Sequence, residues 1–156
     1  MVLRENAILI LMYLLGAALL FLLWWPLGLI YLVYCALSNF LYMARVCPYC
    51  GHYAAGTCPA GFDWLSGQRY KPREGLDFMS QFRRWSIALY PGWFLPPIIG
   101  TCLIFREWSW LALVLTVLFC GVGFIWLPVD SRRHCEKCDN LDCPRRRGKM
   151  KVVGVE

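Results

Sequence analysis

The chain has 156 residues, 59% of them hydrophobic and 17% charged, and it carries a formal net charge of +6 at neutral pH. Charged side chains make up about a quarter of an ordinary soluble domain, so this composition excludes one. We therefore expect a single all-α integral membrane domain over residues 1–156. Membrane proteins carry an excess of positive charge in their cytoplasmic loops, which explains the basic balance without a nucleic-acid partner.

The first two predicted elements are uncharged apolar runs at residues 7–25 and 27–44. A helix rises about 1.5 Å per residue, so each run covers the roughly 30 Å hydrocarbon core of a bilayer. One continuous helix over both runs would overshoot any bilayer, and Pro26 and Gly28 stand where the chain must turn. The sequence therefore predicts a helical hairpin, with the tryptophan pair before the proline at the membrane interface.

A more polar segment, residues 45–84, follows the first hairpin, and we expect it to form a loop outside the membrane. Near its end, Leu76, Met79, Phe82 and Trp85 recur at helical spacing. This pattern predicts a short interfacial helix that leads into the third span. The apolar face of this helix would pack either on lipid or on the cysteine-rich loops.

The third and fourth predicted spans, residues 85–105 and 108–129, form a second hairpin around a polar turn at Arg106 and Glu107. Prolines interrupt the third span, and we expect them to break or kink its helix and to leave carbonyl groups without intrahelical partners. An alternative is one span over residues 98–127 with the two turn charges buried as a pair, which leaves three crossings. The prolines are Pro91, Pro96 and Pro97.

The distribution of charge favours four crossings. With four, the N-terminus, the loop 45–84 and the tail 130–156 share one side of the membrane, and that side holds every lysine and arginine except Arg106. Because positively charged loops mark the cytoplasmic side, we expect both termini in the cytoplasm and the protein in an inner or plasma membrane. The basic tail is expected to meet anionic lipid headgroups.

The nine cysteines divide into two groups by position. Cys35, Cys102 and Cys120 fall inside predicted spans, where a cysteine usually packs as a small apolar residue. The other six form two triplets, and each triplet has a C-x2-C pair, a Cys-Pro ending and a histidine beside it. The candidate metal ligands are Cys47, Cys50, Cys58 and His52 in the loop, and Cys135, Cys138, Cys143 and His134 in the tail.

The spacing within the triplets is the reason to expect a metal. A C-x2-C turn lets two thiolates point at one ion about 2.3 Å away, and a glycine after the second cysteine eases the backbone of that turn. The stretch Cys47-Pro48-Tyr49-Cys50-Gly51 resembles the knuckle of zinc ribbons and rubredoxins, which implies a ligand pair at its two cysteines. Each triplet could form its own site, or the two C-x2-C pairs could join in one four-thiolate site that bridges the hairpins.

Other chemistry for these cysteines stays open. An iron–sulfur cluster also takes thiolate ligands, and the Cys-Pro endings resemble those of ferredoxins and of polytopic membrane polyferredoxins. A C-x2-C pair could instead cycle as a dithiol with a quinone, and the reducing cytoplasm also permits ordinary thiols. We favour zinc as the cofactor, with an iron–sulfur cluster as its first alternative.

No sequence pattern points to catalytic residues. The four spans as assigned contain no Asp, Glu, Lys, Arg or His, which disfavours ion transport, and the chain has no phosphate-binding loop or serine-hydrolase elbow. We therefore expect a structural or accessory subunit of a membrane complex, in contact with lipids and with other subunits or further copies of itself. The alternatives are an iron–sulfur electron carrier that serves the quinone pool and a membrane thiol–disulfide oxidoreductase.

Overall fold

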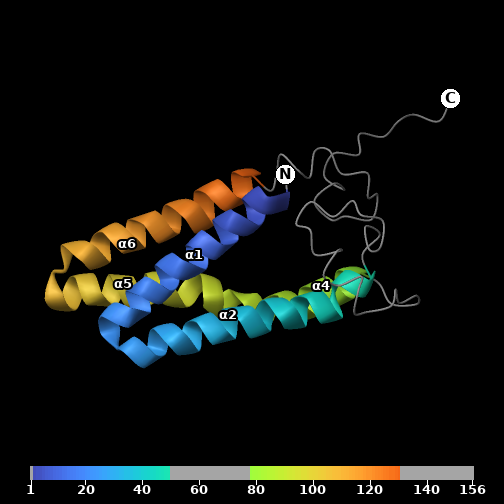
Figure 1. Ribbon diagram of the computed structural model, residues 1–156, viewed down its shortest axis with the longest axis horizontal. Coiled ribbons are helices and arrows are strands. Elements are labelled where there is room, and N and C mark those ends of the chain that lie inside the picture. The colour runs from blue at the N-terminus through green and yellow to red at the C-terminus, as the bar shows by residue number, and fades with distance from the viewer. Residues whose placement is uncertain (1, 50–77, 131–156) are drawn as a thin grey trace.

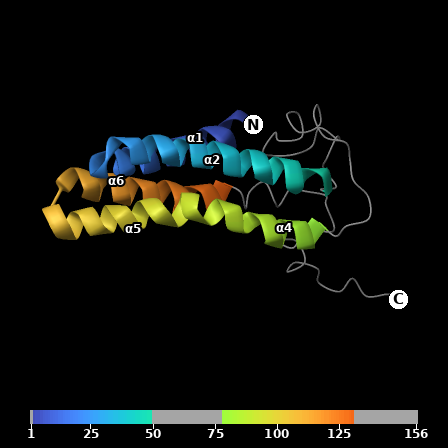
Figure 2. The same cartoon turned by 90° about the horizontal axis from the view of Figure 1, so that it is seen from below.

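The computed structural model describes residues 2–49 and 78–130, and every regular element in these ranges is helical. Four helices are long and apolar enough to cross a membrane, and they lie together as an elongated bundle (Figure 1, Figure 2). The prediction of an all-helical protein with four membrane-length helices is therefore confirmed. The four stretches are Asn6–Leu23, Trp25–Tyr49, Ser80–Arg106 and Trp110–Asp130.

Helix α1 (Val2–Leu23) is the centre of the bundle. It packs along α2 (Trp25–Arg45), α5 (Tyr90–Glu107) and α6 (Trp110–Cys120), whereas α2 and α5 touch each other at few positions. In Figure 1, α1 crosses α5 and lies between α2 and α6. The core around it includes Met12, Leu19, Leu20, Tyr31 and Phe119.

The connection from α1 to α2 and the connection from α5 to α6 lie at the same end of the bundle, away from the N-terminus (Figure 1). The first is made by Trp24, whose extended backbone separates α1 from α2. Its amide donates to the Leu20 carbonyl and its carbonyl accepts from the Leu27 amide, both at 3.0 Å. Pro26 falls in the first turn of α2, where a missing N–H group costs no helical hydrogen bond, so it starts a helix instead of breaking one.

The second connection is formed by Trp108 and Ser109. Trp108 has the left-handed conformation that ends many helices, with φ 45° and ψ 46°, and its amide donates to the Ile104 carbonyl at 3.1 Å. The Ser109 hydroxyl accepts from the Ala112 amide at 3.3 Å and caps α6. Because one helix ends here and another begins, the alternative of a single span over residues 98–127 is excluded.

The third span consists of α4 (Phe78–Ser86), the 3₁₀ turn η2 (Ile87–Leu89) and α5 in direct succession. The change from α-helix to 3₁₀ turn comes just before Pro91, where the sequence predicts a break. At Pro96 and Pro97, by contrast, α5 continues as an α-helix. A break at these two prolines is therefore excluded, whereas a kink stays a prediction. Helix α4 lies where the apolar spacing predicts a short helix before the third span.

The fourth span contains a wider turn. After α6 the chain passes through the π-helical turn η3 (Gly121–Trp126) before the helix ends at Asp130. At Gly123 the backbone comes so close to the central helix that a Cβ would stand 2.9 Å from the Sδ atom of Met12. A glycine at this position therefore lets the fourth span pack directly on α1.

Most of the apolar surface of the bundle faces outward. Only 22% to 33% of the residues in each membrane-length stretch are buried. Ile30, Ile98 and Val117 are among the many large apolar side chains exposed over more than half of their surface. A soluble monomer rarely exposes apolar surface on this scale, whereas a membrane protein presents it to lipid. The fold therefore supports a membrane protein.

Candidate functional site

Cys47 is the predicted metal ligand that the described residues include. It begins η1 (Cys47–Tyr49), a 3₁₀ turn that follows α2 directly. The Val46 amide donates to the Tyr42 carbonyl at 2.9 Å, which closes α2 just before the turn. Val46 and Pro48 are buried and Cys47 is half-buried. The first cysteine of the loop C-x2-C pair thus sits in a defined turn at the end of a membrane-length helix.

The remaining predicted ligands all lie outside the described residues. Within residues 2–49 and 78–130, no group of three histidine, cysteine, aspartate or glutamate side chains could hold a metal ion. A zinc site and an iron–sulfur cluster would both need ligands from beyond these ranges, so both stay predictions. The ligands concerned are Cys50, His52, Cys58, His134, Cys135, Cys138 and Cys143.

The ends of the described segments that are nearest in sequence to the two cysteine triplets lie at one end of the bundle. Helix α2 ends at Arg45, α4 begins at Phe78 and the fourth span ends at Asp130, all away from the two connecting turns (Figure 1, Figure 2). Helix α1 also begins at this end. We call it the exit end, because the chain leaves the bundle toward both triplets there.

Asp130 is a buried carboxylate that the sequence analysis does not single out. It is only 3% exposed, at the last residue of the fourth span. The apolar run ends one residue earlier, so sequence alone assigns Asp130 to the polar tail. Burial of an acid depends on packing around it, which no local pattern reveals.

Three arginines and one tryptophan gather at the exit end. The guanidinium carbon of Arg45 lies 5.2 Å from the centroid of the Trp85 ring, and that of Arg84 lies 5.9 Å from it. The Trp85 Nε1–H donates to Gln81 Oε1 at 3.2 Å, which orients the ring. Arg83, next to Arg84, is exposed like the other two arginines. We call Arg45, Arg83, Arg84 and Trp85 the basic cluster; its cation–π contacts link the ends of α2 and α4.

Helix α4 is held to α2 by its aromatic side chains. Phe82 packs edge-on against Tyr42 with ring centroids 6.3 Å apart, and Phe78 lies 5.9 Å from Phe82. The sequence predicts that the apolar face of this helix meets lipid or the cysteine-rich loops. At Phe82, this face instead packs on α2. This contact fixes the position of the basic cluster relative to the bundle.

Two tyrosines of α2 donate hydrogen bonds to the third span. The Tyr31 hydroxyl donates to the Gly92 carbonyl at 2.7 Å, and the Tyr34 hydroxyl donates to the Ala88 carbonyl at 2.6 Å. Pro96 has no N–H group, so the Gly92 carbonyl, four residues earlier, lacks its helical partner. Tyr31 satisfies that carbonyl from another helix, which is why α5 tolerates the proline.

A partly buried polar patch continues from these tyrosines toward α1. The Asn39 Nδ2 group donates to the Tyr13 hydroxyl and to the Cys35 carbonyl, both at 2.8 Å. Cys35 is buried, and its Sγ atom is 3.4 Å from the place a Cβ on Gly92 would take. Cys35 thus packs as a small residue, as predicted for it. The tyrosine donors are missed by the sequence analysis, although the prolines signal that donors are needed.

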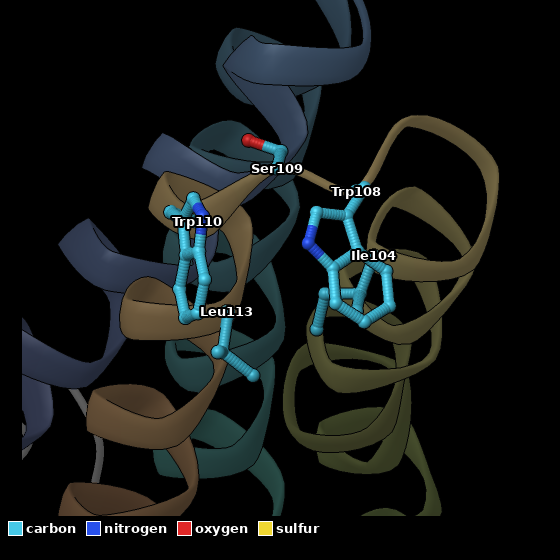
Figure 3. Close-up of a pocket in the computed structure, with 5 residues that line it drawn as sticks. All are labelled: Ile104, Trp108, Ser109, Trp110 and Leu113. Carbon is cyan, nitrogen blue, oxygen red and sulfur yellow. The ribbon is translucent and has the colours of Figure 1, made fainter.

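A small apolar cavity lies at the other end of the bundle, beside the second connecting turn. Its volume is about 130 Å³, and Figure 3 shows the two indoles standing on either side of it. Its polar side chain, Ser109, already caps α6, so the cavity offers no titratable group for catalysis. The lining residues are Ile104, Trp108, Ser109, Trp110 and Leu113.

Comparison with known proteins finds no match: no protein-family model, no curated protein and no solved structure corresponds to this chain. Functional inference therefore depends on the residues of the chain itself.

Proposed function

We propose that the protein is a structural or accessory subunit of a membrane complex, with a zinc–thiolate site on the cytoplasmic face of an inner or plasma membrane. The observation that carries this proposal is the position of Cys47. It lies half-buried in the η1 turn at the exit end, where the fourth span also ends, at Asp130. Both C-x2-C pairs are therefore close in sequence to the same end of the bundle.

The proposed ligands begin with the two C-x2-C pairs, because a tight turn presents both of its thiolates to one ion. The other cysteines and the histidines would complete one site per triplet, or stand beside a single shared site. The pairs are Cys47 with Cys50 and Cys135 with Cys138, and the additional ligands are Cys58, Cys143, His52 and His134.

A zinc tie at the exit end would have a physical role. We propose that α1 and α2 insert as one hairpin and that α5 and α6 insert as the other, joined at the connecting turns. The hydrophobic effect does not drive such hairpins together inside lipid. A structural zinc site can contribute about 10 kcal/mol or more to folding in small domains, which would fix one hairpin to the other.

The outward apolar surface would meet both lipid and the other members of the proposed complex. Lipid tails and partner helices, either from other subunits or from further copies of this chain, would share the exposed sides of the four spans. Chemical cross-linking in native membranes would identify these neighbours.

The basic cluster supports a cytoplasmic exit end. Its arginines lie at the exit end, whereas Arg106 lies near the opposite one. Reporter fusions at the N-terminus, near Tyr70 and at Glu156 should all indicate the cytoplasm. A fusion in the Trp108–Ser109 turn should indicate the other side, and an outside location for the C-terminus would contradict four crossings.

Elemental analysis of the detergent-purified protein tests the metal. We expect colourless protein with about one or two zinc ions per chain, according to whether the triplets share a site. Protein purified without oxygen that is brown and absorbs broadly in the visible would instead identify the iron–sulfur electron carrier. Protein without stoichiometric metal but with a reducible C-x2-C disulfide would identify the thiol oxidoreductase.

Cysteine variants test the ligand assignment. Cys50→Ser and Cys138→Ser should each lower zinc content and folded yield sharply, because each removes a thiolate from the site. Cys102→Ser is the matched control, since Cys102 is exposed on α5 and belongs to neither triplet. Full zinc content in both ligand variants would contradict the proposed site.

A further inference from the structure

We infer that the basic cluster at the exit end binds the phosphate of an anionic phospholipid headgroup. The inference rests on the membrane embedding in the proposed function and is independent of the zinc site. It is carried by the grouping of charges, by the level of the cluster on the third span and by its fixed position.

The basic cluster gathers three positive charges at one place on the exit end. Arg45 and Arg84 both approach the ring of Trp85, and Arg83 is adjacent in sequence. Among the described residues, no carboxylate forms an ion pair with any of these three arginines. Cations gathered around one ring repel each other, and an anion that contacts them reduces that repulsion. The planar fork of guanidinium donors matches the oxygens of a phosphate.

The surface beside the cluster changes from charged to apolar within about one helical turn. Directly after α4, Ile87 and Tyr90 are 63% and 54% exposed. Tryptophan is enriched at the level of lipid headgroups, so Trp85 marks the interface, and the arginines stand at phosphate depth. Acyl chains would then lie along Ile87 and Tyr90. A phospholipid satisfies both the charged and the apolar part of this surface, which a nucleic acid would not.

The cluster is also fixed in place. Its cations come from two helices, Arg45 from α2 and Arg84 from α4. The edge-on contact of Phe82 with Tyr42 holds these helices together, and the hydrogen bond from Trp85 to Gln81 within α4 orients the ring. A headgroup bound between the two arginines would therefore bridge preformed partners, at little cost in side-chain ordering.

Lipid binding by the full-length protein in a neutral detergent tests the inference. The probes are phosphatidylglycerol and phosphatidylcholine with identical acyl chains, and native mass spectrometry counts the bound lipids. The natural protein should prefer phosphatidylglycerol. The double variant Arg45→Gln with Arg84→Gln should lose about tenfold in affinity for phosphatidylglycerol, with little change for phosphatidylcholine.

Three further variants sharpen the result. Arg106→Gln is the matched control at the opposite end, and it should bind like the natural protein. Replacing Arg45 and Arg84 by lysine keeps the charge and should keep most of the preference. If the double glutamine variant does not fold, the single variant Arg84→Gln serves instead, because Arg84 is exposed and its loss should still weaken binding several-fold.

The inference is overturned if the natural protein does not distinguish the two lipids, or if the folded glutamine variants retain its preference. An equal loss in Arg106→Gln would also overturn it. Excess inorganic phosphate should not displace phosphatidylglycerol, and full displacement would instead indicate a site for soluble anions. Zinc content measured on the same samples separates failure of the metal proposal from failure of this one. Protein that stays soluble without detergent would contradict the membrane embedding itself.

Discussion

The α2 side and the α6 side of the bundle are held by different kinds of contact. On the α2 side, hydroxyl groups of Tyr31 and Tyr34 reach carbonyls of the third span. On the α6 side, glycines at positions 100 and 123 let the backbones of neighbouring helices approach closely. Close packing and hydrogen bonding are the two means of helix association that lipid leaves available. A tyrosine supplies the donor for the Gly92 carbonyl that Pro96 leaves unpaired, and glycines allow close packing on the α6 side.

The α6 side shows how close the packing is. A Cβ on Gly100 would overlap the Thr116 hydroxyl and would stand 3.3 Å from a methyl carbon of Leu19. The Thr116 hydroxyl donates to the Ala112 carbonyl of its own helix at 2.7 Å, so it needs no partner on α5. Three helices therefore meet around the missing side chain of one residue.

The largest expected effect comes from filling that space. Gly100→Val should lower the free energy of unfolding in detergent by about 3 kcal/mol, because Thr116 and Leu19 cannot both move away. The control is Gly121→Val, where a Cβ would meet nothing within 4 Å. Equal destabilisation by the two substitutions would show that close packing on the α6 side is not what the glycine provides.

The next effect tests the reason for the tyrosine on the α2 side. Tyr31→Phe should cost about 1 kcal/mol of unfolding free energy, because it leaves the Gly92 carbonyl buried without a donor. The same substitution should cost less in a Pro96→Ala background, since alanine restores the N–H group four residues after Gly92. A double-mutant cycle by thermal or chemical unfolding measures this coupling, and its absence would separate the tyrosine from the proline.

A smaller effect is expected for the second tyrosine. Tyr34→Phe should cost about 0.5 kcal/mol, because its bond to Ala88 is only partly buried and water or a neighbour can replace the donor. Tyr90→Phe provides the comparison, since Tyr90 is more than half exposed on the third span. Unfolding measurements should place Tyr34→Phe between Tyr90→Phe and Tyr31→Phe, and a different order would contradict the role of burial.

The smallest effect should come from the hydroxyl on the α6 side. Thr116→Val keeps the shape of the side chain and removes a hydroxyl that bonds only within its own helix. The unfolding free energy should therefore change by less than about 0.5 kcal/mol. A loss as large as that of Tyr31→Phe would mean that hydrogen bonding also holds the α6 side together.

The sequence predicts the four spans of this bundle better than it predicts the contacts between them. Uncharged runs of membrane length are enough to predict four helices, because each helix satisfies its own backbone within lipid. The effect of Pro96 is not predictable in the same way. Its cause, a missing N–H group, is visible in the sequence, but its remedy comes from Tyr31, 61 residues before the Gly92 acceptor. Contacts at that separation depend on how whole helices pack.

The metal site, too, is predictable from the sequence only in part. The C-x2-C spacing is local and predicts a turn, and Cys47 lies at the start of a 3₁₀ turn. Which thiolates share an ion depends on how two distant segments meet, and spacing within either segment does not determine that. The basic cluster shows the same limit: Arg83 and Arg84 stand out as a charged pair, but their association with Arg45 requires the fold.

The π-helical turn η3 gives the fourth span about one more residue than an α-helix would hold over the same rotation. Each residue of an α-helix advances by about 100°, whereas a turn bonded from i to i+5 spreads one extra residue over that rotation. Removal of one residue from Gly121–Trp126 should therefore let the turn become α-helical and leave the rotational phase of the residues up to Asp130 nearly unchanged. Removal of one residue from α6 would instead rotate the residues that follow it by about 100°.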